Sequence, residues 1–298
     1  MKIFLLLILF QVNAFGAACC GGSSALPSLI TGDNGAQFSV AQSLGKVVGR
    51  TYAKDQSVFY ANSKKYQTLT TSFKGAYLLS PLFQIGGGIS LIHKDNSDKS
   101  VKESKTLLGD ADLSITYEYL PEKFYSVWKP RGFIYFKQTF PTGKSNFETT
   151  TTLLTDVSGK GQYSSALGLV FSKIFKSIDW QFFSEYRYLY KEEIGKTSIA
   201  ESSADSQGFS IGYSPNNGAI RTSIGVTRNH YNDKEITINN LRQNSNREEY
   251  WDFELGLAYM INDSTFNLSY TDQTILGSTE NTTLSRTIAI SWLERWPL

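Results

Sequence analysis

Short and long connections alternate along almost the whole chain. From about residue 37 to the end, twelve segments have the pattern of β-strands. Four of the connections are tight: Ser80–Leu82, Phe175–Ile178, Pro215–Gly218 and Asn262–Ser264. The others are long and polar, near residues 53–66, 95–108, 141–161, 191–207, 232–247 and 272–284. Tight turns on one side and long loops on the other are typical of a membrane β-barrel.

The strand segments alternate apolar and polar residues with a period of two. For example, Trp251, Phe253 and Leu255 alternate with Asp252 and Glu254. In a soluble sandwich the apolar set would face inward. Here the other set is rich in Ser, Thr, Gly, Asn and charge, as a water-filled or hydrogen-bonded interior requires. We therefore predict an all-β fold, a twelve-stranded antiparallel transmembrane barrel with short periplasmic turns and long extracellular loops.

Aromatic residues recur at the strand ends beside the tight turns. Amphipathic rings gather at membrane interfaces, so we predict an outward-facing periplasmic girdle at this level. Its predicted members are Tyr77, Tyr119, Phe171, Trp180, Tyr213, Tyr259, Phe266 and Trp292. Phe133, near the start of the strand after residues 121–130, is expected to face outward with them. Because the strand number is even, both chain ends should lie on the periplasmic side.

The N-terminus has the pattern of a secretory signal peptide. One lysine precedes the unbroken apolar run Ile3–Phe10, and small residues follow. We predict a signal peptide over 1–18, a periplasmic linker or short plug over 19–36 and the barrel over 37–298. Cys19 would then be the first mature residue, which makes it a candidate for lipidation. The alternative is a flexible tail that carries two adjacent exposed thiols.

Charged residues occur at inward positions of the predicted strands. These candidate lumen-lining residues are Lys74, Asp112, Glu118, Lys137, Glu185, Arg187, Arg221, Asp252 and Glu254, four positive and five negative. One interpretation is a narrow aqueous passage whose opposed charges select solutes. The other is a network of salt bridges that fills the lumen, because charges in a narrow interior need partners. Twelve strands lie between the filled eight-stranded and the open sixteen-stranded barrel, so both interpretations stay open.

Other function classes lack support in the sequence. After the N-terminus there is no stretch of 18 apolar residues that would form a membrane helix. The formal net charge of +2 gives no reason to expect a nucleic-acid partner. An outer-membrane lipase would need a serine placed near a histidine, and neither His93 nor His230 has a serine two residues on. We predict no catalytic residue, cofactor or metal site.

The long loops carry many cations. A further hypothesis is that they contact phosphates of the outer-leaflet glycolipid. The loop cations are Lys54, Lys64, Lys65, Lys94, Lys99, Lys102, Lys105, Lys191, Lys196, Arg242 and Arg247. Asp and Glu are interspersed with them, so simple solvation is the alternative.

Two stretches resemble a known family. The strand Gly109–Tyr119 is similar to a "G-D-x-x-L-x-x-x-Y" strand, and Thr139–Ser145 to a "P-T-G" strand exit followed by a Gly-rich segment at 159–163. Both are found in outer-membrane barrels of the phenol-degradation meta-pathway or transporter-like family, and the resemblance covers about 109–172. It implies passage of small, often hydrophobic, molecules without catalytic residues. Such barrels usually end on an aromatic residue, whereas this chain ends Trp-Pro-Leu.

Together these patterns predict a porin-like barrel in the outer membrane of a Gram-negative-type envelope. The expected function is a channel or transporter that passes small molecules, not an enzyme. The alternative is a structural or adhesion barrel with a closed lumen and functional extracellular loops. The expected partners are outer-membrane lipids, the barrel-assembly machinery and a small-molecule solute.

Overall fold

The computed structural model describes residues 26–54, 56–61, 64–122, 126–215, 218–277 and 279–297. The predicted signal peptide, Cys19 and the centre of the Pro215–Gly218 turn lie outside these residues. Almost all of the described chain is β-structure, with one short 3-10 helix, η1 (Asn146–Glu148). Among the described residues, no helix is both long and apolar enough to cross a membrane.

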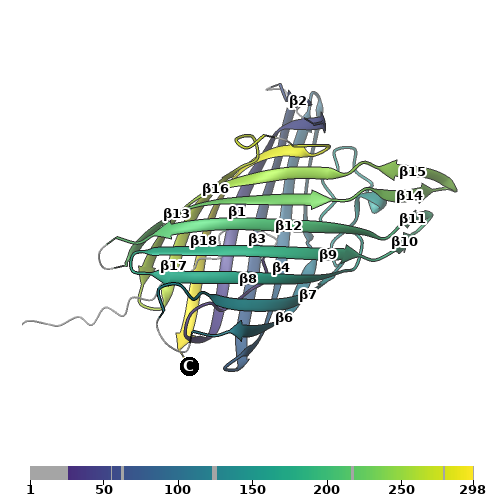
Figure 1. The fold of residues 1–298 in the computed structure, drawn as a ribbon. Coiled ribbons are helices and arrows are strands. Elements are labelled where there is room, and N and C mark those ends of the chain that lie inside the picture. Colours follow the sequence, from purple (N-terminus) through teal and green to yellow (C-terminus); the bar gives the residue numbers. More distant parts are fainter. Residues whose placement is uncertain are drawn as a thin grey trace, which may run out of the picture.

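Twelve antiparallel strands form a closed barrel (Figure 1). In chain order they are β1 (Asn34–Ala53), β3 (Lys64–Ser80), β4 (Phe83–Asp98), β6 (Ala111–Leu120), β7 (Arg131–Phe140), β8 (Ser164–Phe175), β9 (Ile178–Leu189), β12 (Ser202–Tyr213), β13 (Ile220–Tyr231), β16 (Glu248–Ile261), β17 (Ser264–Asp272) and β18 (Thr283–Pro297). Each pairs with the next, and β18 returns to β1 from Asn34↔Pro297 to Arg50↔Thr283. The predicted fold class is confirmed.

The long connections contain strands of their own, which corrects their prediction as plain loops. These strands are β2 (Gln56–Phe59), β5 (Val101–Leu108), β10 (Glu192–Ile194), β11 (Thr197–Ile199), β14 (Lys234–Ile238) and β15 (Leu241–Ser245). β5 extends β4 as a hairpin, and β10, β11, β14 and β15 form a small separate sheet. The β14–β15 turn uses Asn239 and Asn240, both with positive φ, which suits a tight hairpin turn.

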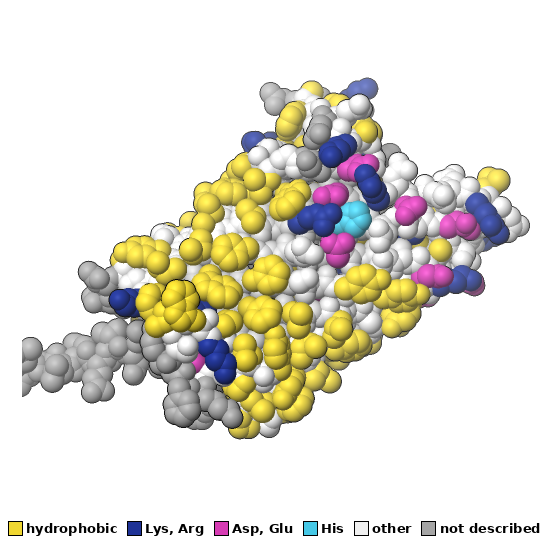
Figure 2. Space-filling view, viewed as in Figure 1, with side chains coloured by type: hydrophobic (Ala, Val, Ile, Leu, Met, Phe, Trp, Pro, Cys, Tyr) yellow, Lys and Arg dark blue, Asp and Glu magenta, His cyan; other side chains and the backbone are white. Residues whose placement is uncertain are grey.

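The outer wall of the barrel is apolar. Outward side chains such as Leu113, Ile115 and Ile290 are 60%, 57% and 57% exposed, as expected for positions that face lipid. Figure 2 shows the apolar side chains spread over the wall, with charged side chains gathered mainly toward the long-loop end. The predicted direction of the apolar face, outward to lipid, is therefore confirmed.

The eight predicted girdle residues have outward positions at the strand ends beside the short turns. Among them, Tyr77, Tyr213 and Phe266 are 57%, 53% and 49% exposed. Neighbouring rings contact each other: the ring centroids of Tyr119 and Phe171 are 6.2 Å apart. Their role as an interface girdle stays a prediction.

Phe133 was wrongly predicted to face outward. In the structure it is fully buried inside the barrel. Its cross-strand partners are Glu118 and Val170, and it shares the inner face of β7 with Tyr135 and Lys137. The longer connection at 121–130 shifts the start of β7, so its first ring falls on the inner face.

Barrel closure predicts a specific sensitivity in β18. We expect the native protein to migrate faster on a detergent gel unheated than boiled. Ala289→Pro should abolish this shift, because Ala289 pairs with Ser43 on one side and Ser269 on the other. Proline in the middle of a sheet removes a ladder hydrogen bond and is found essentially only on edge strands or at bulges. Ala289→Ser is the control and should keep the shift; equal behaviour of the two variants would contradict this account of closure.

Candidate functional site

An ion cluster occupies the interior at mid-barrel. Lys137 Nζ of β7 lies 2.6 Å from Glu185 Oε2 of β9, and Arg187 Nη2 lies 2.6 Å from Glu185 Oε1. The Tyr135 hydroxyl donates to Glu185 Oε2 at 2.8 Å. The Lys137 and Glu185 side chains are only 4% and 1% exposed. Charges this deeply buried persist because each is paired, since an unpaired buried charge is costly.

A second ion pair lies at the periplasmic end of the same wall. Arg221 of β13 binds Asp179 of β9 in a bidentate manner, with Nε–Oδ2 at 2.7 Å and Nη2–Oδ1 at 2.5 Å. Both side chains are 5% exposed. The sequence analysis predicted Arg221 as lumen-lining but missed Asp179. The signal was present, because Asp179 has the same parity along β9 as Glu185.

A third pair holds the start of β7. Arg131 donates from Nε to Glu118 Oε1 at 2.7 Å and from Nη2 to Glu118 Oε2 at 3.0 Å. Glu118 was predicted as a lumen residue, and its cation was missed because Arg131 directly follows the long 121–130 connection. The structure thus brings together charges that the sequence could only assign to the same face.

The remaining predicted lumen residues also lie on the inner side. Asp252 accepts hydrogen bonds from Asn229 Nδ2 at 3.0 Å and Gln273 Nε2 at 2.9 Å. Lys74 and Asp112 converge beside Gly88, where an added Cβ would lie 3.1 Å from both Lys74 Cγ and Asp112 Oδ1. Glu254 lines a small inner pocket, described below. Whether any of these side chains lines a passage stays a prediction.

The described part of the N-terminal segment, residues 26–33, runs inside the barrel. Leu26 and Leu29 belong to one buried cluster with Phe133, Val170 and Phe183, together with Tyr135. Apolar burial of this kind is the main stabilising contribution for a segment without its own secondary structure. These leucines come from the stretch predicted as linker or plug.

Hydrogen bonds fix the backbone of this segment. Ile30 N donates to Gln84 Oε1 at 2.7 Å, and Gln84 Nε2 donates back to Ile30 O at 3.2 Å. Arg131 Nη1 donates to Thr31 O at 2.8 Å. Gly86 allows the close approach, because an added Cβ there would lie 2.5 Å from Ser28 O. The segment therefore fits against β4 and β7 in one defined position.

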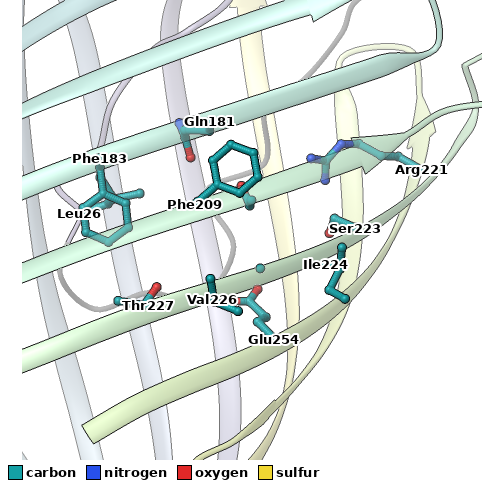
Figure 3. A pocket seen from close by; sticks show the side chains of 12 residues that line it. Leu26, Gln181, Phe183, Phe209, Arg221, Ser223, Ile224, Val226, Thr227 and Glu254 are labelled. Carbon is teal, nitrogen blue, oxygen red and sulfur yellow. The ribbon is translucent and has the colours of Figure 1, made fainter. Parts of the chain in front are cut away.

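Little free volume remains beside the segment. The pocket in Figure 3 measures about 40 Å³ and is lined by Leu26, Phe183, Arg221, Thr227 and Glu254, among others. This volume holds a few water molecules, since one water needs roughly 10–15 Å³ by this measure. This pocket is therefore too small for a solute larger than a few water molecules.

An ordered loop lies at the opposite, extracellular end. Asp156 is fully buried in the 141–161 connection and accepts hydrogen bonds from Thr149, Thr150 N at 3.0 Å and Thr151 Oγ1 at 2.8 Å. Lys144 Nζ lies 2.5 Å from Asp156 Oδ2. Burial would raise the pKa of Asp156, but these donors outweigh it and hold the pKa well below its ordinary value. The carboxylate thus organises the loop around itself.

Neighbouring elements hold this loop in place. Glu103 of β5 accepts hydrogen bonds from Thr152 N at 3.1 Å and Leu153 N at 2.8 Å. At its other end, Gln162 accepts a hydrogen bond from Lys234 Nζ of β14 at 3.0 Å. Burial lowers the pKa of Lys234, and the nearby positive charge of Lys160 lowers it further. The loop therefore bridges the β4–β5 hairpin and the small extracellular sheet.

Comparison with known proteins identifies the fold. No protein-family model matches the chain, and no curated protein matches it. A solved outer membrane channel from Pseudomonas putida F1 is similar with a TM-score of 0.69 at 14% identity, over 92% of this chain and 98% of that one. The chain has the fold of an outer-membrane β-barrel. Its closed sheet and apolar outer wall lead to the same conclusion.

Two other barrels are similar at a lower level. The translocator domain of the autotransporter NalP from Neisseria meningitidis has a TM-score of 0.47 at 9% identity, over 88% of each chain. The NanC porin has a TM-score of 0.47 at 11% identity, over 88% of this chain and all (100%) of that one. The resemblance of residues 109–172 to the meta-pathway family stays a prediction.

The 141–161 loop should depend on the charge of Asp156. Asp156→Asn should open the loop, because hydrogen bonds to charged groups contribute about 1.5–3 kcal/mol. We expect roughly tenfold faster cleavage within 141–161 when protease is added outside intact cells. Because the folded-state pKa lies below the unfolded value of about 3.9, the native loop should stay closed from pH 8 to about pH 4 and loosen only as the pH falls toward the lower pKa.

Glu193→Gln is the matched control for this experiment. Glu193 is an acidic residue of a neighbouring loop whose side chain is 72% exposed. Its loss should leave the cleavage rate unchanged. Equal rates for Asp156→Asn and the native protein would show that the carboxylate does not hold the loop.

Proposed function

We propose that this barrel is a channel that passes small molecules across the outer membrane. The proposal rests on the position of residues 26–33 inside the barrel. A short segment of the chain itself, residues 26–33, lies inside the periplasmic end, and it is held by apolar contacts and a few hydrogen bonds. A segment attached in this way can leave while the sheet stays closed, because β1 begins only at Asn34.

The interior charges favour solutes of low net charge. Counting the predicted lumen residues with their partners Arg131 and Asp179, five side chains are positive and six are negative. Three acids, Glu118, Glu185 and Asp179, have a cation within 2.7 Å. A wall of neutralised pairs offers hydrogen-bonding groups without a strong net field. We therefore propose neutral or zwitterionic small molecules as the solute class.

The alternative function is a structural or adhesion barrel with a closed lumen. The small sheet β10–β11–β14–β15 and the ordered 141–161 loop favour it, because together they present a folded extracellular surface. In that case the interior ion pairs would serve only to fill the barrel.

Weakening the hold on residues 26–33 distinguishes the two functions. Leu26→Asn with Leu29→Asn should increase conductance in planar bilayers and solute flux into liposomes. Burying one leucine contributes about 1.5–3 kcal/mol, so the pair should shift the closed-to-open ratio by about a hundredfold or more. Leu241→Asn is the control, because Leu241 is 70% exposed at the start of β15, outside the barrel. Absence of conductance and flux in all variants would favour the structural barrel.

Removal of one interior cation should change ion selectivity. Lys137→Gln leaves Glu185 paired with Arg187 alone and makes the interior more negative. A unit charge about 8 Å from a passing ion is worth about 2 kcal/mol at an effective dielectric constant of about 20, so the cation-to-anion permeability ratio should rise at least about tenfold. The reversal potential in a salt gradient measures this. Lys102→Gln, on the exposed face of β5, should leave it unchanged; the same ratio in all three proteins would place Lys137 off the ion path.

A further inference from the structure

Two cations face outward at the seam where the barrel closes. Lys46 of β1 and Arg286 of β18 are direct cross-strand partners. Both are exposed, and they share the outer face with Leu44 and Ile288, which are 48% and 54% exposed. We call Lys46 and Arg286 the seam cations.

The seam cations have fewer acidic partners than positive charges. Asp272 of β17 lies 3.0 Å from Arg286 Nε, but its carboxylate also accepts hydrogen bonds from Tyr270 and Thr274. Among the described residues, no acidic side chain forms an ion pair with Lys46. One carboxylate therefore faces two cations.

Two other cations on the outer face have acidic partners. Arg228 lies between Glu249 at 2.9 Å and Asp205 at 3.4 Å. Lys65 binds Asp95 at 2.7 Å. The charges of both cations are therefore balanced within the protein, unlike that of Lys46.

The height of the seam cations corresponds to the outer leaflet. Arg286 lies six residues from Trp292 and ten from Trp296, both at the periplasmic end of β18. At about 3.3 Å per residue this is roughly 20–33 Å along the strand, or about 15–25 Å across the membrane after a tilt of about 40°. The apolar band of such a barrel is about 25 Å tall, so the seam cations lie in its upper half.

An apolar groove lies below the seam cations on the same strands. Its volume is about 620 Å³, and its wall includes Val40 of β1, Leu257 of β16, Leu268 of β17 and Ile290 and Trp292 of β18. The lining side chains Leu257, Leu268 and Ile290 are 46%, 47% and 57% exposed and point away from the lumen. The groove therefore opens toward the membrane.

We propose that this seam binds a phosphorylated glycolipid of the outer leaflet. Its phosphate lies between Lys46 and Arg286, and one acyl chain descends into the groove. The charge supports this choice, because a phosphate monoester or diester supplies the anion that Lys46 lacks. The groove supports it independently, since its lining is mainly apolar, with Gln42, Asn267 and Ser291 as the polar exceptions, and suits a hydrocarbon chain. The site is separate from the lumen and from the proposed channel function.

Lys46→Glu tests the phosphate contact and leaves the Arg286–Asp272 pair intact. The protein is extracted from outer membranes in mild detergent, and retained glycolipid is counted by native mass spectrometry. We expect the native protein to retain one glycolipid and the variant at least tenfold less. Lys176→Glu is the control and should keep retention, because Lys176 is an exposed cation in the short turn between β8 and β9, at the end of the barrel away from the outer leaflet. Equal retention by Lys46→Glu and the native protein would overturn the proposal.

Leu268→Trp tests the groove without changing charge. A larger ring fills the space below the seam cations and should also lower retention. Leu113→Trp is its control, because Leu113 is an outward residue 60% exposed on β6, far from the seam in strand order. The unheated gel shift must persist in every variant, which excludes misfolding as the cause of lipid loss. Unchanged glycolipid retention by Leu268→Trp would show that no acyl chain lies in the groove.

The lipid itself is varied in nanodiscs of defined composition. The native protein should retain phosphorylated glycolipid and lose its dephosphorylated form at least tenfold more readily. Equal retention of both forms would overturn the phosphate contact. Equal retention of phosphatidylglycerol would show a general site for anionic lipids and overturn the assignment to the glycolipid.

Discussion

Hydrogen bonding of the backbone in lipid is the constraint on which this structure depends. The hydrocarbon region offers no water, so each N–H and C=O must find a partner within the protein. The chain meets this requirement by pairing β18 with β1 along fifteen residue pairs, which leaves no open sheet edge. Closure then divides each strand into a lipid face and an inner face. Every feature of the interior and of the outer wall follows from that division.

Inside the barrel, buried charged side chains also need partners, because little solvent reaches them. Lys137, Glu185 and Arg187 form one group and Arg221 with Asp179 another, and both are almost inaccessible to solvent. The two sequence interpretations of the lumen charges, selection and closure, are therefore not exclusive. The ion pairs stay on the wall, whereas residues 26–33 fill the space beside it. Displacement of that segment would expose a neutralised polar surface.

Period-two alternation made the fold and the outward face predictable, because it depends only on neighbouring residues. Phe133 was misplaced because its face depends on the length of the irregular 121–130 connection. Parity places Asp179 on the inner face, but its pairing with Arg221 could not be predicted, since β9 and β13 are far apart in sequence. The pairing of Arg131 with Glu118 depends on the register across the irregular 121–130 connection. The β14–β15 hairpin could have been predicted, because Asn239-Asn240 between alternating residues is a turn signal. The apolar Leu26 and Leu29 likewise indicated a buried segment.

The strand β1 joins the two sites proposed for this barrel. Residues 26–33 precede it inside the lumen, and Lys46 lies on its outer face twelve residues beyond its start at Asn34. Movement of the inner segment needs no break in the β1–β18 ladder, because the pairs begin at Asn34↔Pro297. A lipid held by Lys46 and Arg286 would span both strands of this ladder. It would thus stabilise the seam that must remain closed when the interior opens.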